Sequence, residues 1–291
     1  MVKFFPLAFI LLWSSAFISG KVIVADASPL TALFFRFVIV TAGYLIFAMI
    51  AKQKILYPFA ESRKAMATGI LFHGIYLGGC WFAFSKGMPA GIVALIVTLQ
   101  PILTSLLAGP LLGERVTWRQ WIGIVLGFGG TLLVLGIDVL EAFPMIALTA
   151  SCVALLAITA GTLWQKKLSM EMPLSVNNIY QSFSASIFLL ILSFSLESPF
   201  INFTTSFVLA MAWQIIAVSF GAFTILMFLI KKGSASKTSA LFFLIPPVSA
   251  VMGWLFVEET LTTCDLIGLC IATLGVYIAT RKESVTHLQK V

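Results

Sequence analysis

The chain has 291 residues, of which 60% are hydrophobic and only 10% are charged. A soluble domain carries about 25% charged residues, so this composition excludes an ordinary soluble protein and predicts an integral membrane protein. The net charge of +7 could indicate nucleic-acid binding, but in a membrane protein it is typical of cytoplasmic loops that are rich in Lys and Arg.

Ten segments in chain order qualify as transmembrane helices, because crossing a ~30 Å hydrocarbon core takes about 20 mostly apolar residues. Helices are expected because lipid does not tolerate unpaired backbone groups. The gaps between the segments are short and carry most of the charges. The predicted ranges are 4–20, 28–50, 65–85, 90–112, 118–137, 144–165, 174–196, 207–230, 236–257 and 264–280.

The first segment also has features of a signal peptide, since Lys3 precedes its apolar core and small residues follow near Ser19. A counterpart in the sixth segment favours a helix that is retained. With the N-terminus inside, basic residues concentrate in the inner loops, and both termini are predicted to be cytoplasmic. The inner set is Lys3, Lys52, Lys54, Arg63, Lys64, Arg115, Arg119, Lys166, Lys167, Lys231, Lys232, Lys237, Arg281, Lys282 and Lys290, against Lys21 and Lys86 outside.

The two halves of the chain align with an offset of about 145 residues. Pro101 lies 13 residues before Glu114, and Pro246 lies 13 residues before Glu259. Because each half has five helices, an odd number, the second copy starts on the opposite side of the membrane from the first. The sequence therefore predicts an all-α membrane protein of ten transmembrane helices in two inverted five-helix repeats.

The repeats are assigned to residues 1–140 and 141–291. Inverted repeats are a recurring architecture of secondary transporters, in which the substrate binds near the midplane between the halves. Two similar units packed in opposite senses give outward-open and inward-open states of comparable energy. The duplication thus favours transport by alternating access over a receptor or a purely structural role.

Three motifs resemble those of a known family. They are Trp13-Ser14-Ser15-Ala16-Phe17 in the first segment, Phe35-Arg36-Phe37 in the second and Gly113-Glu114-Arg115-Val116-Thr117 after the fourth. Their order and spacing resemble the EamA-type ten-helix exporters of the drug/metabolite transporter superfamily. In the second copy Glu258 stands where the family pattern has Gly, and the alignment gives the family role to Glu259.

Prolines interrupt the fourth and ninth segments in matching positions, at Pro101 and at Pro246 and Pro247. Each proline removes an amide donor and frees a carbonyl four residues earlier, which is tolerated at membrane depth only against protein or a wet cavity. We expect hinges or kinks there, which either only shape the packing or border the substrate site. Gln100 adds a side-chain amide beside the first of them.

Arg36 is the basic residue predicted to lie deepest in the membrane. An Arg near a helix centre costs ~2.5–3.5 kcal/mol on insertion scales, so it marks either a site for a substrate carboxylate or an anchored helix end. Aromatic and amide side chains in other segments form a plausible cavity lining, although each one alone also suits an interfacial belt. The candidate substrate-binding residues are Trp13, Arg36, Tyr76, Trp81, Gln100, Trp164, Tyr180, Gln181 and Phe243.

Glu114 and Glu259 fall at the ends of segments four and nine, where we expect each to fix the turn to the next helix. His73 is the one group inside a predicted helix that titrates near neutral pH, and no Asp or Glu lies deep in any segment. The spacing of Gly123 and Gly127 predicts tight helix packing or dimerisation. The four cysteines form no C-x-x-C pair, so neither a metal nor a cofactor is expected.

These features predict an inner-membrane secondary transporter rather than an enzyme, because a membrane-embedded enzyme needs clustered His, Asp, Glu or Cys. The family resemblance implies export of amino acids or related small metabolites. The alternative is efflux of drugs and cationic compounds, or another organic-solute permease of the same superfamily. The expected partners are a small organic solute and the lipid bilayer, without nucleic acid, and the protein is expected to be a monomer or homodimer.

Overall fold

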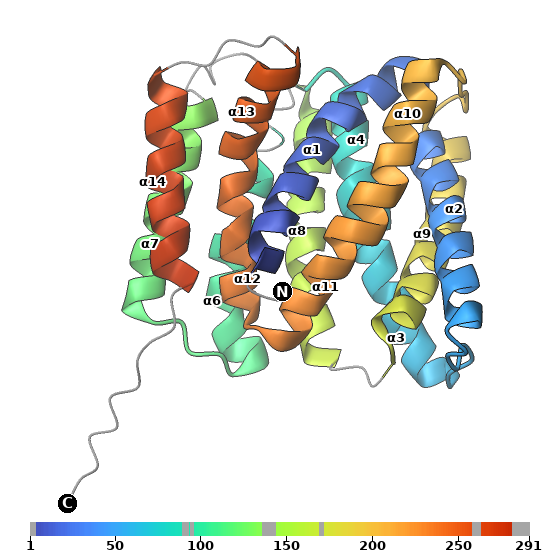
Figure 1. Cartoon of the computed structure of the whole chain (residues 1–291), viewed down its shortest axis with the longest axis horizontal. Coiled ribbons are helices and arrows are strands. Elements are labelled where there is room, and N and C mark those ends of the chain that lie inside the picture. The colour runs from blue at the N-terminus through green and yellow to red at the C-terminus, as the bar shows by residue number, and fades with distance from the viewer. Residues whose placement is uncertain are drawn as a thin grey trace, which may run out of the picture.

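The computed structural model describes residues 4–88, 93, 96–135, 144–168, 172–257 and 263–280. These residues are helical or connect helices, and an isolated bridge between Ala27 and Ile201 is the one pairing of extended backbone among them. The helices run side by side and are joined at the two ends of the bundle (Figure 1).

The uninterrupted α-helices include α1 (Phe5–Asp26), α2 (Pro29–Ile50), α7 (Trp118–Leu135), α8 (Met145–Leu168) and α9 (Leu174–Leu196). Two rods contain a π-helical segment: α3 (Phe59–Gly69), η2 (Ile70–Leu77) and α4 (Gly78–Ser85), then α10 (Thr205–Trp213), η3 (Gln214–Ala222) and α11 (Phe223–Lys232). The remaining elements are α6 (Gln100–Leu112), α12 (Ala235–Ala240), the 3₁₀ turn η4 (Leu241–Leu244), α13 (Ile245–Val257) and α14 (Thr263–Thr280).

A described helix overlaps each predicted range, but three boundaries differ by six residues or more. The first helix continues to Asp26 instead of ending at residue 20, and the third begins at Phe59 instead of residue 65. These extra turns are polar or mixed, so hydropathy alone does not assign them to a membrane helix. In the range 90–112 the continuous described helix begins at Gln100, because Pro101 favours the first turn of a helix over its interior.

Six of the described helical rods are long and apolar enough to cross a membrane, so the chain is a multi-pass membrane protein. Two further apolar helices are shorter, at Gln100–Leu112 and Leu266–Thr280. The six rods are Phe5–Asp26, Pro29–Ile50, Phe59–Ser85, Met145–Lys167, Leu174–Leu196 and Thr205–Lys232.

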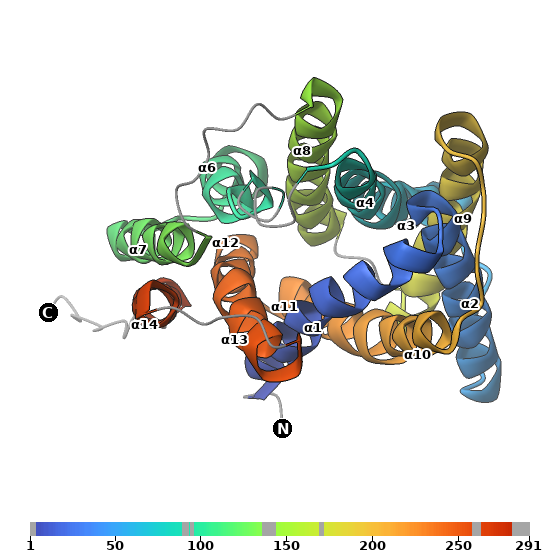
Figure 2. The ribbon, with the colours of Figure 1, turned by 90° about the horizontal axis from the view of Figure 1, so that it is seen from above.

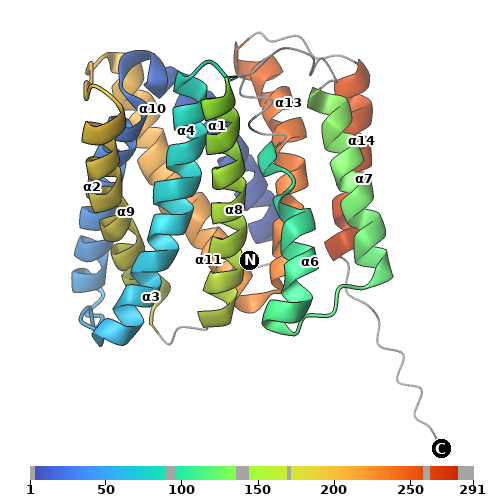
Figure 3. The ribbon, with the colours of Figure 1, turned by 180° about the vertical axis from the view of Figure 1, so that it is seen from behind.

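Helices α7 and α14 form an antiparallel pair at one end of the molecule, and α2 and α9 form another at the opposite end (Figure 2). Between these pairs lie α1, α10, α11 and α13 on one side and α4, α6 and α8 on the other, as the view from behind shows (Figure 3). The largest buried side chains, such as Phe9, Phe72 and Phe243, fill the space among these helices.

Glycines set the close approach of α7 and α14. A Cβ on Gly123 would lie 2.5 Å from the Gly275 carbonyl oxygen, and one on Gly130 would lie 2.6 Å from the Gly268 carbonyl oxygen. A Cβ on Gly275 would in turn meet the Gly127 amide nitrogen at 2.3 Å. The glycine spacing that predicted either tight packing or dimerisation thus serves packing within the chain.

The first turns of α2 and α9 are each held by a side chain that lies just beyond the end of the other helix. The Glu197 carboxylate accepts hydrogen bonds from the Leu30 and Thr31 amides, at 3.2 and 2.7 Å, and from the Thr31 hydroxyl. The Ser175 hydroxyl at the start of α9 donates to Gln53 Oε1. Amides in the first turn of a helix have no partner within the helix, so Glu197 caps the start of α2, whereas Ser175 ties the start of α9 to the chain that follows α2.

Candidate functional site

A cavity opens in the middle of the bundle between α1, α2, the η2–α4 rod and the η3–α11 rod. Its volume, measured as the space open to the centre of a water molecule, is about 60 Å³. A single water needs roughly 10–15 Å³ by this measure, so the cavity suits a small solute rather than a nucleotide. Its lining extends from Trp13 at mid-bundle to Gly20 and Phe84, near the end where α1 and α4 terminate.

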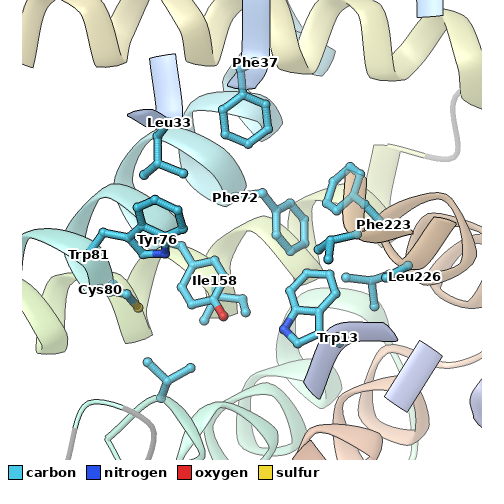
Figure 4. Close-up of a cluster of buried hydrophobic side chains, with 14 of the residues drawn as sticks. Trp13, Leu33, Phe37, Phe72, Tyr76, Cys80, Trp81, Ile158, Phe223 and Leu226 are labelled. Carbon is cyan, nitrogen blue, oxygen red and sulfur yellow. The ribbon is translucent and has the colours of Figure 1, made fainter. Parts of the chain in front are cut away.

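The walls of the cavity are mainly aromatic. Trp13 from α1, Tyr76 from η2 and Trp81 from α4 gather in one cluster with Phe72 and Phe223 (Figure 4). The rings of Phe72 and Phe223 meet edge to face at 5.7 Å between centroids. Such a wall favours an apolar or aromatic part of a solute through contact area and stacking.

Arg36 supplies the positive charge of the cavity. Its side chain is 4% exposed, its Nε donates to the Ser219 hydroxyl at 2.9 Å, and its guanidinium lies 5.2 Å from the centroid of the Phe37 ring. Among the described residues, no carboxylate lines this cavity. A buried cation without a counter-charge is costly in free energy, so the site favours a ligand that brings an anionic group.

Gln214 lines the same cavity and brings beside it a hydrogen-bond acceptor that the described residues leave unpaired. Its Nε2 donates to the Ala16 carbonyl oxygen at 2.8 Å and to the Ser19 hydroxyl at 3.0 Å, which fixes the orientation of the amide. Its Oε1 is buried and has no hydrogen-bond partner among the described residues. An unsatisfied buried acceptor costs about 1–3 kcal/mol, so the site also favours a ligand with an N–H or O–H donor.

The residues facing Arg36 come largely from the two π-helical segments. Segment η2 contributes Phe72, His73 and Tyr76, while η3 contributes Gln214 and Ser219. A π-helix places one extra residue in a turn and is found frequently at functional sites. The His73 ring packs at a tilt against the rings of Phe37 and Phe223, at centroid distances of 4.5 and 4.2 Å.

The predicted proline interruptions lie beside this site, at points where the chain resumes as α-helix after a turn or a 3₁₀ segment. Pro101 lies in the first turn of α6, after a turn at residues 98–99, and Pro246 and Pro247 lie in the first turn of α13, after η4. A proline in the first turn of an α-helix removes no hydrogen bond from that helix. Val97 and Pro246 line a second pocket of about 20 Å³, which shares Trp13 and Tyr76 with the main cavity.

The carbonyls freed by the two prolines of α13 find other partners. Phe242 accepts a hydrogen bond from the Ile245 amide, in the tighter pattern of η4. The Phe243 carbonyl accepts one from the Thr131 hydroxyl of α7, at 3.1 Å. The aromatic ring of Phe243 packs against α7, close to Gly127 and Phe128, and does not line the main cavity.

Two further predicted residues form polar clusters away from the cavity. Gln100 is fully buried, and its Nε2 donates to the hydroxyls of Thr104, Thr162 and Ser239 at 3.1–3.3 Å. This cluster joins α6, α8 and α12. Gln181 is also fully buried, and its amide donates to side-chain oxygens of neighbouring residues on α8 and α9.

The remaining predicted side chains lie outside the cavity. The Tyr180 hydroxyl donates to the Ile55 carbonyl oxygen at 3.0 Å and accepts from the Tyr57 amide, so it holds the connection between α2 and α3. Trp164 on α8 is 43% exposed and faces the outside of the bundle. Of the nine predicted lining residues, the structure thus brings together Trp13, Arg36, Tyr76 and Trp81.

Glu114 does not act on its own turn. Its carboxylate accepts hydrogen bonds from the Ala235 amide at 2.9 Å, and from the amide and hydroxyl of Ser236 at 3.4 and 3.1 Å. It therefore caps the start of α12, in the other half of the chain. The difference arises because Gly113, with φ of 68°, already completes the turn and directs the next residue toward α12. Glu259 lies outside the described residues.

Sequence reasoning missed Gln214, Ser219 and Phe223 as cavity residues. Gln214 carried a usable signal, since an amide side chain within a long apolar segment needs a partner or a function. Ser219 and Phe223 carried no such signal, because serine and phenylalanine are ordinary residues in membrane helices.

Known proteins resemble this chain over most of its length. The model of the EamA-like transporter family matches this chain twice, at residues 3–136 and 145–281. The chain is 28% identical over 231 residues to the uncharacterized transporter YvbV of Bacillus subtilis, which covers 76% of this chain and 71% of that one. It is 23% identical to an uncharacterized transporter of Archaeoglobus fulgidus over 93% of this chain and 95% of that one. A protein of known crystal structure superposes with a TM-score of 0.81 at 19% identity and covers 96% of both chains.

Proposed function

Because the chain belongs to the EamA-like transporter family, we propose that it is a secondary transporter of the inner membrane that exports amino acids or related small metabolites by alternating access. The substrate class is supported chiefly by the presence of both Arg36 and Gln214 in the lining of one aromatic cavity. The guanidinium suits a carboxylate, and Gln214 Oε1 suits an amine or another N–H donor. A zwitterion with an apolar side chain offers a carboxylate to Arg36, an ammonium donor to Gln214 Oε1 and an apolar surface to the aromatic wall.

Reciprocal contacts support the ten-helix architecture with inverted repeats at residues 1–140 and 141–291. With an offset of about 145 residues, Gly123 matches Gly268 and Gly130 matches Gly275. The contact of Gly123 with Gly275 is then repeated by that of Gly130 with Gly268. The π segments η2 and η3 match in the same way, and the family model matches the chain once in each half.

The proposed topology places both termini in the cytoplasm and the end of the cavity at Gly20 and Phe84 on the outside. The opposite end is closed where α6 meets α12, through the Gln100 cluster and through the carboxylate of Glu114. These closing contacts are polar, so they can exchange with water when the halves separate. The structure in this scheme corresponds to an outward-facing state, and the proline-bordered helix starts are the proposed hinges.

Export of cationic compounds is the alternative within the same superfamily. A cationic substrate would have to lie beside the buried guanidinium of Arg36 without a carboxylate on the described cavity wall. Like charges at such short range repel in a low-dielectric interior, so the cavity disfavours this class.

The proposed function is tested by uptake and counterflow in proteoliposomes that contain the purified protein. We expect exchange of at least one labelled amino acid with an apolar side chain and no exchange of cationic dyes. Liposomes without protein give the background. Robust dye exchange without transport of any amino acid would contradict the proposal and favour the alternative.

Glu114→Gln is expected to shift the protein toward the inward-open state, because the neutral amide loses the charge-assisted hydrogen bonds to α12. A loss of about 1 kcal/mol changes the ratio of the two states roughly fivefold. The reporter is Ser105→Cys on α6, a buried position whose hydroxyl has no partner among the described residues. In a background without the native cysteines, its labelling by a maleimide should rise about fivefold.

The matched control is Glu61→Gln, which removes an acidic side chain in the first turn of α3. This variant should leave the labelling of the reporter unchanged. Equal labelling rates in the Glu114→Gln protein and the parent protein would show that the capping contact does not stabilise the closed state.

A further inference from the structure

A third pocket lies at the opposite end of the bundle from Gly20 and Phe84 of the main cavity. It is formed by the turn between α6 and α7, the start of α12 and Ile278 near the end of α14. Its volume, measured as the space open to the centre of a water molecule, is about 270 Å³. Arg115, Arg119 and Lys237 place three positive charges on its walls.

The described residues supply no ion-pair partner for these three cations. The one carboxylate that lines the pocket is that of Glu114, and its oxygens accept the hydrogen bonds from Ala235 and Ser236 at the start of α12. The pocket therefore carries an excess of positive charge, and its remaining lining includes the hydroxyls of Thr117 and Ser234. Such a set of donors fits a phosphate group.

The backbone around these cations is fixed by helix caps. Thr117 and Gln120 form a reciprocal capping box at the start of α7, since the Thr117 amide donates to Gln120 Oε1 at 2.9 Å and the Gln120 amide donates to the Thr117 hydroxyl at 3.4 Å. The Ser234 hydroxyl accepts from the Lys237 amide at 3.1 Å. The positive end of the α7 dipole adds to the attraction for an anion.

The pocket also lies at the depth of lipid headgroups. Trp118, the first residue of α7 and the neighbour of Arg119, is 79% exposed. Exposed tryptophans at helix ends are typical of the membrane–water interface. Basic pockets between helices on the cytoplasmic side of membrane proteins are suited to anionic headgroups.

We propose that this pocket binds a phosphate group, supplied either by an anionic lipid or by free phosphate. The ligand would bridge the turn between α6 and α7, in the first half of the chain, and α12, in the second half. It would therefore stabilise the arrangement in which Glu114 caps α12. Only this regulatory consequence rests on the proposed transport function; binding itself does not.

The test measures thermal unfolding of the full-length protein in an uncharged detergent, followed by tryptophan fluorescence. The protein is titrated with dioctanoyl phosphatidylglycerol, with dioctanoyl phosphatidylcholine and with inorganic phosphate. A ligand that binds only the folded state raises Tm with its concentration. Stabilisation by phosphatidylglycerol alone assigns the site to a lipid headgroup, and stabilisation by inorganic phosphate as well assigns it to phosphate from either source.

The variant Arg119→Gln/Lys237→Gln should weaken the apparent affinity by roughly 10- to 30-fold, because each cation near a headgroup contributes to the attraction. Arg119→Lys/Lys237→Arg retains both charges and should bind nearly as well as the parent protein. Arg63→Gln/Lys64→Gln on α3 removes the same charge elsewhere and should have no effect. Equal stabilisation by phosphatidylcholine, equal stabilisation of the Gln variant, or no stabilisation by any of the three ligands overturns the proposal.

Discussion

Replacing Arg36 with alanine is expected to reduce transport of carboxylate-bearing solutes by at least about 30-fold, while the protein still inserts and folds. Removing one partner of a buried, hydrogen-bonded charge pair costs about 2–5 kcal/mol. Here the second member of the pair is the carboxylate of the solute, so the loss of Arg36 weakens solute binding. Folding is spared, because no carboxylate on the described cavity wall needs Arg36 to balance its charge. Its Nε contacts only Ser219, which remains able to donate to the Gln214 carbonyl at 3.1 Å.

Arg36→Lys separates the role of charge from the role of geometry. Lysine keeps the positive charge but loses both the planar fork and the hydrogen bond from Nε, so we expect an intermediate rate. Initial rates of counterflow in proteoliposomes, divided by the amount of folded protein from size-exclusion chromatography, give the comparison. Arg63→Ala, at an exposed position on α3, serves as the control. If both Arg36 variants transport carboxylated solutes at the parent rate, Arg36 does not bind the substrate.

Gly275→Ala is expected to destabilise the protein by about 2 kcal/mol or more, because a Cβ at this position would lie 2.3 Å from the backbone nitrogen of Gly127. Neither backbone can move without separating α7 from α14. Gly129→Ala is the same chemical change on α7, but a Cβ there meets nothing within 4 Å. Since alanine favours helix over glycine by about 1 kcal/mol, this variant should be neutral or more stable.

Unfolding in mixed micelles with an increasing fraction of sodium dodecyl sulfate, followed by tryptophan fluorescence, measures both variants. Gly275→Ala should lower the fraction of sodium dodecyl sulfate at which half of the protein is unfolded. Gly129→Ala should leave this midpoint unchanged or raise it. A Gly275→Ala protein as stable as its parent would show that the two helices have room to separate, and that the glycines are not required for this contact.

Hydropathy and proline positions predict most of the helix arrangement because lipid constrains composition along whole segments. The range 174–196 agrees residue for residue with α9, since a proline precedes it and a charged residue ends it. Boundaries fail where a helix continues beyond the apolar region, as at Asp26 and Phe59. There, local hydrogen bonding rather than burial in lipid determines where the helix ends.

The candidate site was predictable only in part. Trp13, Arg36, Tyr76 and Trp81 carry features that are rare in a lipid-facing position, and they share one cavity. Gln100 and Gln181 have equally unusual side chains, but their amide nitrogens donate within buried clusters elsewhere, and their Oε1 atoms, like that of Gln214, have no partner among the described residues. Sequence cannot separate these cases, because both a substrate contact and a packing contact require a polar side chain. The π segments have no sequence signature, since one extra residue in a turn changes the helical phase only locally.

The cap that Glu197 provides to α2 also affects how the protein is made. Glu197 is 166 residues away from Thr31, so the ribosome adds this length of chain after the start of α2 has been synthesised. At roughly 5–20 residues per second, α2 waits about 8–33 s for its cap. During that time its first amides need water or lipid headgroups as partners, so this end of α2 must remain at the membrane surface. The nascent first half is therefore an incomplete folding unit, and its α2 reaches its final position only after α9 has entered the bilayer.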